Sequence, residues 1–242
     1  MKHILIFLLI VSVLAAKAQD STDAVTYPRI GLRYGAELGT FANSRLAQMQ
    51  QIMRRLDVDT RSLSTYPVSS WVGFVVEGKQ ATAEFRLIRS GSFSGDSPQM
   101  DVLNPVGRAK FYGVGAGVSV TAHWIRTRRF VAGPTVGYDM VWYRLDLLPV
   151  AKTNVPVANV VQNPPAYATT TFEQNANQNL HLAFGSDVRI HWYREVRFGM
   201  RVGYQLPIAT SKQWALNDGT VGDLPAYRAN MLYVQVSGGY LF

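Results

Sequence analysis

The stretch RIGLRYGAELGT, from Arg29 to Thr40, decides the fold class because its apolar and polar residues alternate without interruption. Alternation with a period of two predicts a β-strand whose two faces meet different surroundings. A soluble sandwich would place Lys, Thr and Ser on the polar face, whereas this stretch places glycines there together with charged residues such as Arg33 and Glu37. This pattern is typical of a small barrel that has lipid outside and a narrow polar lumen inside.

Seven further segments alternate in the same way and predict seven further strands. They are 72–76, 81–87, 111–124, 130–142, 180–192, 196–206 and 230–242. Most of them have the 9–11 residues or so that a tilted strand needs to cross a bilayer. Pro134 lies inside one of them, and a local distortion is expected there because proline donates no backbone hydrogen bond. The last strand should pair with the first and close the barrel.

The predicted connections alternate between short and long. Short turns are expected at 77–80, 127–129 and 193–195, and long connections at 41–70, 94–110, 146–178 and 210–227. Bacterial outer-membrane barrels have short periplasmic turns and long extracellular loops. The sequence therefore predicts an all-β fold, an eight-stranded antiparallel transmembrane up-and-down barrel with its long loops outside the cell.

The composition and the N-terminal segment indicate export. The apolar run from Ile4 to Ala16 and the small-x-small motif at Ala16 and Ala18 predict a cleaved signal peptide over residues 1–18, followed by a barrel domain over 19–242. The chain has no cysteine, 12% aromatic residues and 17% charged residues, and a net charge of +8. For an exported basic protein we expect outer-membrane lipids and lipopolysaccharide as partners, and no nucleic acid.

The inward faces of the predicted strands carry opposite charges, which should form a lumen charge network. Its members are Arg33, Glu37, Glu84, Arg86, Asp139, Asp187, Arg189 and Arg201. A turn at 193–195 would place Asp187 opposite Arg201, and a turn at 77–80 would place Trp71 opposite Arg86 and Gly73 opposite Glu84. An eight-stranded barrel is filled by its own side chains, so the network is expected to be structural, with a gate or proton path as the alternative.

The first long connection contains a predicted amphipathic helix over Ser44 to Leu56, with Ser44 or Asn43 as its N-cap. Its apolar stripe consists of Leu46, Met49, Ile52, Met53 and Leu56. The stripe could pack on the barrel rim. Alternatively, it could act as a lid or a docking surface, because methionine-rich faces adapt to varied partners.

Enzyme and metal chemistry find little support in the residues. Beyond the signal the histidines are His123, His181 and His191, and all three fall on the lumen parity of their strands. A deacylase acting on surface lipid would need an outward histidine near the outer rim. There is no phosphate loop, no dinucleotide fingerprint and no cysteine pair, so we expect a non-enzymatic protein without cofactor or metal.

With its strands placed, the chain resembles the small eight-stranded outer-membrane barrels of the OmpA/OmpX-type class over Tyr27 to Phe242. Its ending, YVQVSGGYLF, resembles the signal that such proteins present to the barrel-assembly machinery, with Tyr240 and Phe242 carrying the match. The AKAQ junction and the Asn/Pro-rich loop are similar to predicted outer-membrane barrels of the Bacteroidetes, including the PorT-like group tied to protein secretion. The resemblance implies an outer-membrane protein that works through its extracellular loops in binding, adhesion or envelope assembly. A secretion component and a narrow channel or small-ligand transporter are the alternatives.

Overall fold

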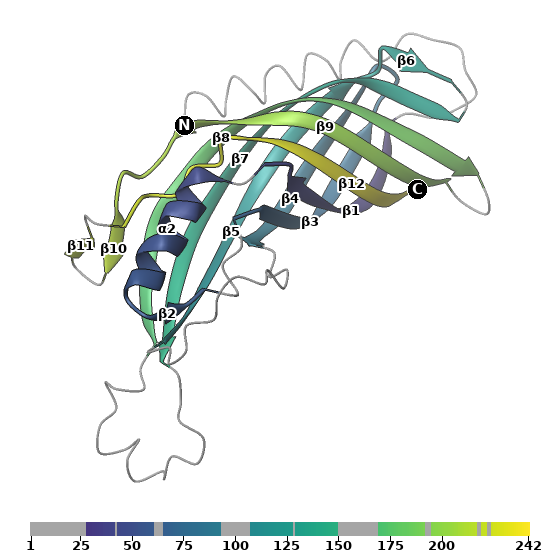
Figure 1. The fold of residues 1–242 in the computed structure, drawn as a ribbon. Coiled ribbons are helices and arrows are strands. Elements are labelled where there is room, and N and C mark those ends of the chain that lie inside the picture. Colours follow the sequence, from purple (N-terminus) through teal and green to yellow (C-terminus); the bar gives the residue numbers. More distant parts are fainter. Residues whose placement is uncertain are drawn as a thin grey trace, which may run out of the picture.

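The fold is a closed barrel of eight long antiparallel strands, which confirms the fold class predicted from the alternation (Figure 1). The computed structural model describes residues 28–41, 43–60, 65–92, 107–127, 129–149, 169–191, 195–216, 219–221 and 224–242. The signal peptide predicted at 1–18 and the Asn/Pro-rich segment at 150–168 lie outside these residues. The long strands are β1 (Arg29–Gly39), β3 (Pro67–Glu77), β4 (Ala81–Ser92), β5 (Gly107–Ala122), β7 (Phe130–Pro149), β8 (Thr170–His191), β9 (Glu195–Ala209) and β12 (Met231–Leu241).

The last strand closes the barrel by pairing with the first, as predicted. The β1–β12 ladder runs from Gly31 opposite Leu241 to Gly39 opposite Tyr233, and the Phe242 amide donates to the Ile30 carbonyl oxygen at 2.8 Å. Each of the other long strands pairs with both of its neighbours around the barrel. Because the ring is closed, its long strands leave no unpaired edge that another chain could extend.

One helix and four short strands decorate the barrel ends. They are α2 (Ser44–Arg55), β2 (Val58–Asp59), β6 (Ile125–Arg126), β10 (Trp214–Leu216) and β11 (Gly219–Val221). Figure 1 shows α2, β2, β10 and β11 gathered at one end, which we call the cap end, and β6 with the C-terminus at the other, which we call the turn end. No helix among the described residues is long and apolar enough to span a membrane.

The two faces of the strands follow the predicted parity, so this barrel is apolar outside and charged inside. In β1, Leu32 and Tyr34 are 54% and 68% exposed, whereas Arg33 and Glu37 are only 3% and 6% exposed. Large exposed apolar side chains recur on every long strand of the barrel, including Phe74, Phe85, Val114, Phe184 and Phe198. The interior glycines leave room for the charged side chains. A Cβ added to Gly117 would lie 1.7 Å from Asp139 Oδ1.

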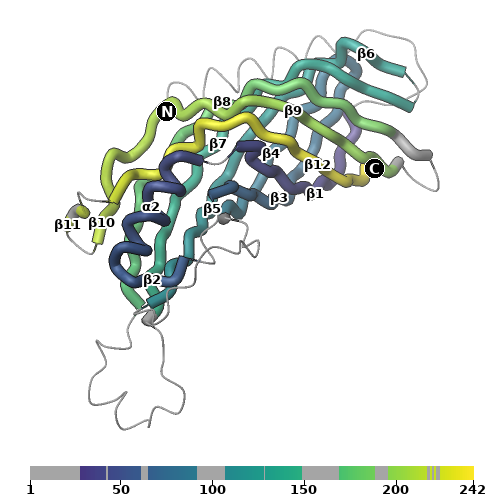
Figure 2. The backbone as a smooth tube through the Cα atoms, viewed as in Figure 1, coloured from purple at the N-terminus to yellow at the C-terminus, as the bar shows by residue number. Residues whose placement is uncertain are grey.

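The strand lengths correct the prediction at the cap end. Residues 146–149 belong to β7 and 170–178 belong to β8, although the sequence assigned the whole of 146–178 to a loop. Figure 2 shows these two strands extending far at the cap end together with β5, whose first residue, Gly107, lies opposite Pro149. Residues 107–110, which the sequence assigned to the loop at 94–110, therefore also belong to a strand. Polar, asparagine-rich composition suggested a loop, but here the side chains of Gln174 and Asn177 are buried and hydrogen-bonded to the backbone of the cap. The predicted loop at 210–227 likewise contains the β10–β11 hairpin.

Two predicted registers are wrong by two residues. In β8–β9, Arg201 lies opposite Gly185 and Asp187 lies opposite Gly199, because the described ladder ends with His191 opposite Glu195 rather than with Trp192 opposite Val196. In β3–β4, Trp71 lies opposite Ile88 and Gly73 opposite Arg86. There the turn is tighter than expected, with Gly78 donating to the Ala81 carbonyl oxygen at 2.8 Å. A shift of two keeps every side chain on its face, so parity alone could not detect it.

The expected distortion at Pro134 is present on one side of β7. The β5–β7 ladder stops with Thr121 opposite Thr135, and pairing resumes through β6 with Ile125 opposite Ala132, one residue out of register. Pro134 therefore occupies a gap in the ladder, where its missing N–H costs nothing. The short turn predicted at 127–129 is present between β6 and β7, where the Thr127 amide donates to the Phe130 carbonyl oxygen at 2.8 Å.

Candidate functional site

Glu84 is the hub of an ion-pair network that crosses the barrel interior. This β4 carboxylate accepts from Arg201 of β9 at 3.2 and 3.3 Å, and from Arg33 of β1 at 3.5 Å. Arg86, two residues along the same strand, lies 3.8 Å away. All four side chains are at least 95% buried. One carboxylate thus ties three arginines from three different strands to one point in the lumen.

A second branch leads from Arg86 towards the cap. Its guanidinium donates to Asp139 Oδ1 at 2.9 Å and lies 5.6 Å from the ring centre of Trp71. The other oxygen of Asp139 lies 2.5 Å from His181 Nε2. His181 was assigned to the lumen face by parity but was not included in the predicted network. It is also in hydrogen-bond range of Gln205, at 3.3 Å between Nε2 atoms.

The structure places seven of the eight predicted network residues inside the barrel. Arg33, Glu37, Glu84, Arg86, Asp139, Asp187 and Arg201 all point into the lumen. The predicted Asp187–Arg201 pair is wrong, because Asp187 pairs with Arg33 and Arg201 pairs with Glu84. The side chain of Arg189 lies outside the described residues.

A separate ion pair closes the turn end of the lumen. Glu77, which is fully buried, pairs with Arg197 and lies 3.8 Å from Arg126 of β6. The alternation predicts that both Glu77 and Arg197 face inward, and the structure confirms this for both side chains. The predicted charge network did not include them.

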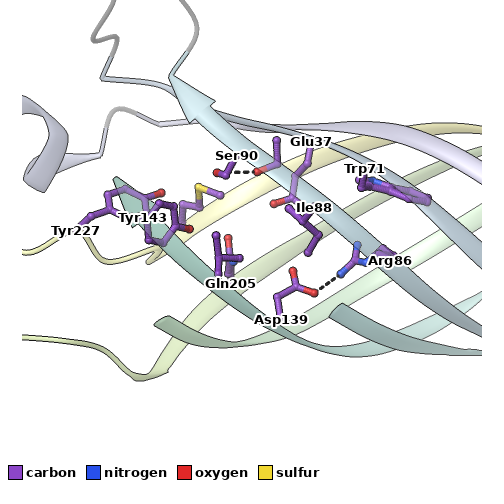
Figure 3. A pocket seen from close by; sticks show the side chains of 12 residues that line it. Glu37, Trp71, Arg86, Ile88, Ser90, Asp139, Tyr143, Gln205 and Tyr227 are labelled. Carbon is purple, nitrogen blue, oxygen red and sulfur yellow. Dashed lines mark hydrogen bonds and ion pairs between the residues drawn. The ribbon is translucent and has the colours of Figure 1, made fainter. Parts of the chain in front are cut away.

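A small cavity lies between the network and the cap (Figure 3). Figure 3 shows Glu37, Arg86 and Asp139 on its network side and Tyr143 and Tyr227 on its cap side. About 10 Å³ of it is open to the centre of a water molecule, which is space for about one water. Glu37 lines this cavity and has no direct ion pair among the described side chains.

The cap covers this cavity with an aromatic cluster. Tyr143 stacks on Phe111 with ring centres 5.4 Å apart, and Tyr227 meets both rings at 4.5 and 5.0 Å. Burial raises the pKa of Tyr227, which keeps its phenol neutral. The Tyr227 carbonyl accepts from both Gln174 and Asn177 at 3.0 Å. Hydrogen bonds to the backbone and packing of the Tyr227 ring therefore hold the 224–230 segment across the open end of the barrel.

The helix α2 lies at the position predicted for it, one residue shorter at its end. Asn43 is the N-cap, accepting from the backbone amides of Arg45 and Leu46 at 3.0 and 3.3 Å. Of the predicted stripe, Leu46, Met49 and Met53 are buried in the cap core, Ile52 is half-buried and Leu56 is exposed. The buried members pack with Trp214, Leu224 and the aromatic cluster. This arrangement favours the rim-packing interpretation over docking through the stripe, because three of its five residues are not accessible to a partner.

The chemistry of this interior is that of a closed, charged core. The Asp139–His181 pair is the nearest approach to a catalytic arrangement, but His181 is only 2% exposed. Among the described residues no group of three or more His, Cys, Asp or Glu side chains is arranged to hold a metal ion. The site's evident capacity is to hold strands together across the lumen and to fill its cross-section.

Comparison with known proteins gives a distant structural similarity. No family model matches the chain, and no curated protein matches it significantly. Among solved structures the chain is similar to Neisserial surface protein A (NspA), with 9% sequence identity, coverage of 88% of this chain and 95% of that chain, and a TM-score of 0.44. A similarity this distant carries no functional argument.

Proposed function

We propose that the protein is an integral outer-membrane barrel whose work is done at its cap end, outside the cell. The main support for the proposal is that the barrel is polar inside and apolar outside, which is the reverse of a soluble protein. A closed barrel with charged side chains in its lumen and large apolar side chains around its wall suits lipid as its surroundings. In water the same wall would be an exposed apolar surface far larger than a soluble monomer carries.

The proposed task is binding at the cell surface, in adhesion or envelope assembly. The interior supports this choice over a transport role, because Glu84 and its arginines cross the lumen while the aromatic cluster and α2 cover its mouth. Among the described residues, the polar face of α2 and the hairpin β10–β11 are accessible at the cap end. In α2 the exposed residues include Gln48, Gln51 and Arg55.

The topology can be tested with single cysteines, because the native chain has none. Gln51→Cys lies on the exposed face of α2, and Gln80→Cys lies in the exposed turn at the opposite end. In intact cells a membrane-impermeant maleimide should label Gln51→Cys and leave Gln80→Cys unlabelled until the outer membrane is opened. Equal labelling of both, or recovery of the protein in the soluble fraction, would refute the proposal.

The channel alternative makes a different prediction. If the lumen conducts, purified protein in a planar bilayer should give discrete current steps that scale with the number of inserted barrels. The filled lumen leads us to expect none. Reproducible steps in the wild-type protein would instead favour a channel or transporter.

A PorT-like role in protein secretion would use the same exposed surface. It predicts partners that are lost when Gln48, Gln51 and Arg55 are replaced together by alanine, a change that leaves the buried stripe intact. Cross-linking in intact cells with and without this replacement separates the two roles. A secretion component should lose a secreted partner, whereas an adhesin should lose only attachment to its target.

A further inference from the structure

All outward-facing charges that the structure describes on the long strands lie on four neighbouring strands. The outward, even-numbered positions of β9, β12, β1 and β3 carry no charged residue. By contrast, the outward positions of β4, β5, β7 and β8 carry four cations and two carboxylates, all towards the cap end. The cations are Arg89, Arg108, Lys110 and Arg144, and the carboxylates are Asp146 and Glu173. Contact with lipid hydrocarbon alone does not explain why the outward charges lie on one side of the barrel.

Tyr112 lies at the centre of this patch. Arg144 sits directly opposite it in the β5–β7 ladder and lies 6.0 Å from its ring centre. Lys110 is the next outward residue along β5, and Arg89 lies opposite Val114, the next outward residue in the other direction. Arg89 is therefore a diagonal neighbour of Tyr112, at a distance of about 7–8 Å. The tyrosine thus has one cation directly opposite, one along its own strand and one on the diagonal.

The carboxylates in the patch are already engaged, and two cations are not. Glu173 pairs with Arg144, and Asp146 accepts from Tyr112 at 3.0 Å and from Thr171 at 2.8 Å. The remaining cation, Arg108, pairs with Asp59 at 3.5 Å. Lys110 lies directly opposite Asp146 in the β5–β7 ladder, but among the described residues neither Arg89 nor Lys110 has a carboxylate within ion-pair distance. With Asp59 counted, four cations face three carboxylates, so the patch keeps one net positive charge that an anion can neutralise.

Directly towards the turn end the same wall becomes apolar. Leu87, Val114 and Trp142 are 56%, 60% and 52% exposed on β4, β5 and β7. Val114 and Trp142 are cross-strand neighbours, so their side chains form one continuous surface. A ligand that matches both parts must carry phosphate at one end and acyl chains at the other.

We infer that the outer wall of β4, β5 and β7 is a binding site for a phosphorylated glycolipid of the outer leaflet, of the lipid A class. Arg89, Lys110 and Arg144 bind the phosphates, Tyr112 packs at the sugar level, and the chains lie along Leu87, Val114 and Trp142. The inference rests on the proposed membrane location, with the cap end outside. Beyond that location, the inference specifies which face of the barrel binds the lipid and which residues recognise it.

The test compares lipid retained by purified barrels in nanodiscs that contain bisphosphorylated lipid A. Arg89→Gln with Lys110→Gln removes the two uncommitted cations without breaking an ion pair. The matched control, Lys212→Gln with Arg228→Gln, removes two exposed cations of the cap that lie off the barrel wall. Because each cation near an anionic lipid surface strengthens binding by roughly fivefold, the site variant should bind lipid A about 10- to 30-fold more weakly, and the control should bind like the wild type.

Two further arms identify what is recognised. Dephosphorylated lipid A should bind wild type and site variant equally, and inorganic phosphate should not compete at millimolar concentration. Equal retention of bisphosphorylated lipid A by the site variant and the control, in barrels that insert normally and keep their heat-modifiable migration, would overturn the site alone. Failure of the wild-type protein to insert into lipid would overturn the proposed membrane location, and with it this inference.

Discussion

Replacing Glu84 by glutamine should be among the most damaging conservative changes in the barrel. The substitution keeps the size of the side chain but removes the one negative charge shared by Arg33, Arg86 and Arg201. Arg33 and Arg86 would retain Asp187 and Asp139 as partners. Arg201 has no second carboxylate partner among the described ion pairs and would be left as a buried, uncompensated cation.

The magnitude follows from the geometry of the Arg201 contact. Two unit charges 3.2 Å apart attract by about 5 kcal/mol at an effective dielectric constant of about 20. Breaking one side of a buried pair typically costs about 3–5 kcal/mol. We therefore expect Glu84→Gln to lower the free energy of unfolding by about 3 kcal/mol or more.

Reversible urea unfolding in lipid vesicles measures this, followed by tryptophan fluorescence and by the mobility shift of the folded barrel. Glu173→Gln is the matched control, because Glu173 also pairs with an arginine but both partners are about half exposed. It should cost at most about 1 kcal/mol. Adding Arg201→Gln to Glu84→Gln should recover part of the loss, since it removes the orphaned charge. If Glu84→Gln costs no more than Glu173→Gln, the network does not stabilise the barrel and the reasoning fails.

Three other changes test the interior, the cap and the closing strand. Gly117→Ala should cost about 1–3 kcal/mol in the same unfolding assay because its Cβ would displace Asp139, whereas Gly91→Ala, whose nearest neighbour would be 3.6 Å away, should be tolerated. Met49→Asp should make the cap protease-sensitive in intact cells while the barrel keeps its heat-modifiable migration, because it buries a charge in a fully enclosed site; an unchanged digestion pattern would argue against a packed cap. Phe242→Ala should slow barrel assembly, measured as the rate at which the folded gel band appears, and Phe242→Tyr should not; equal rates would remove the assembly role of this ring.

The alternating residues predicted which side chains face inward, and the structure bears this out at Arg33, Glu84, Asp139 and Arg201. Alternation is a local property of one strand, so it is readable without knowing the neighbours. The pairing of these charges was not readable, because it depends on the turn lengths. Because the turn after Glu77 is tighter than predicted, Arg86 lies opposite Gly73 and not opposite Trp71. The β8–β9 register likewise differs from the predicted one and places Arg201 opposite Gly185.

The ends of the strands and the packing of the cap also could not be predicted from local sequence patterns. Gln174 and Asn177 sit in a segment whose composition is typical of loops, and they become strand residues because the cap supplies carbonyl partners for their side chains. Similarly, the stripe of α2 showed that a helix would form but did not show what would cover it. Trp214 and Tyr227 cover it, from segments more than 150 residues further along the chain.

By itself the sequence determined the strands, their inner and outer faces, the helix and the closure of the last strand on the first. These features follow from side-chain periodicity, which each strand or helix expresses on its own. Only the tertiary structure decided that Glu84 is the hub, that Asp187 pairs with Arg33, that the mouth is covered and that the outward charges gather on one wall. Those outcomes depend on registers and on contacts across the barrel, where a shift of two residues preserves every face but changes every partner.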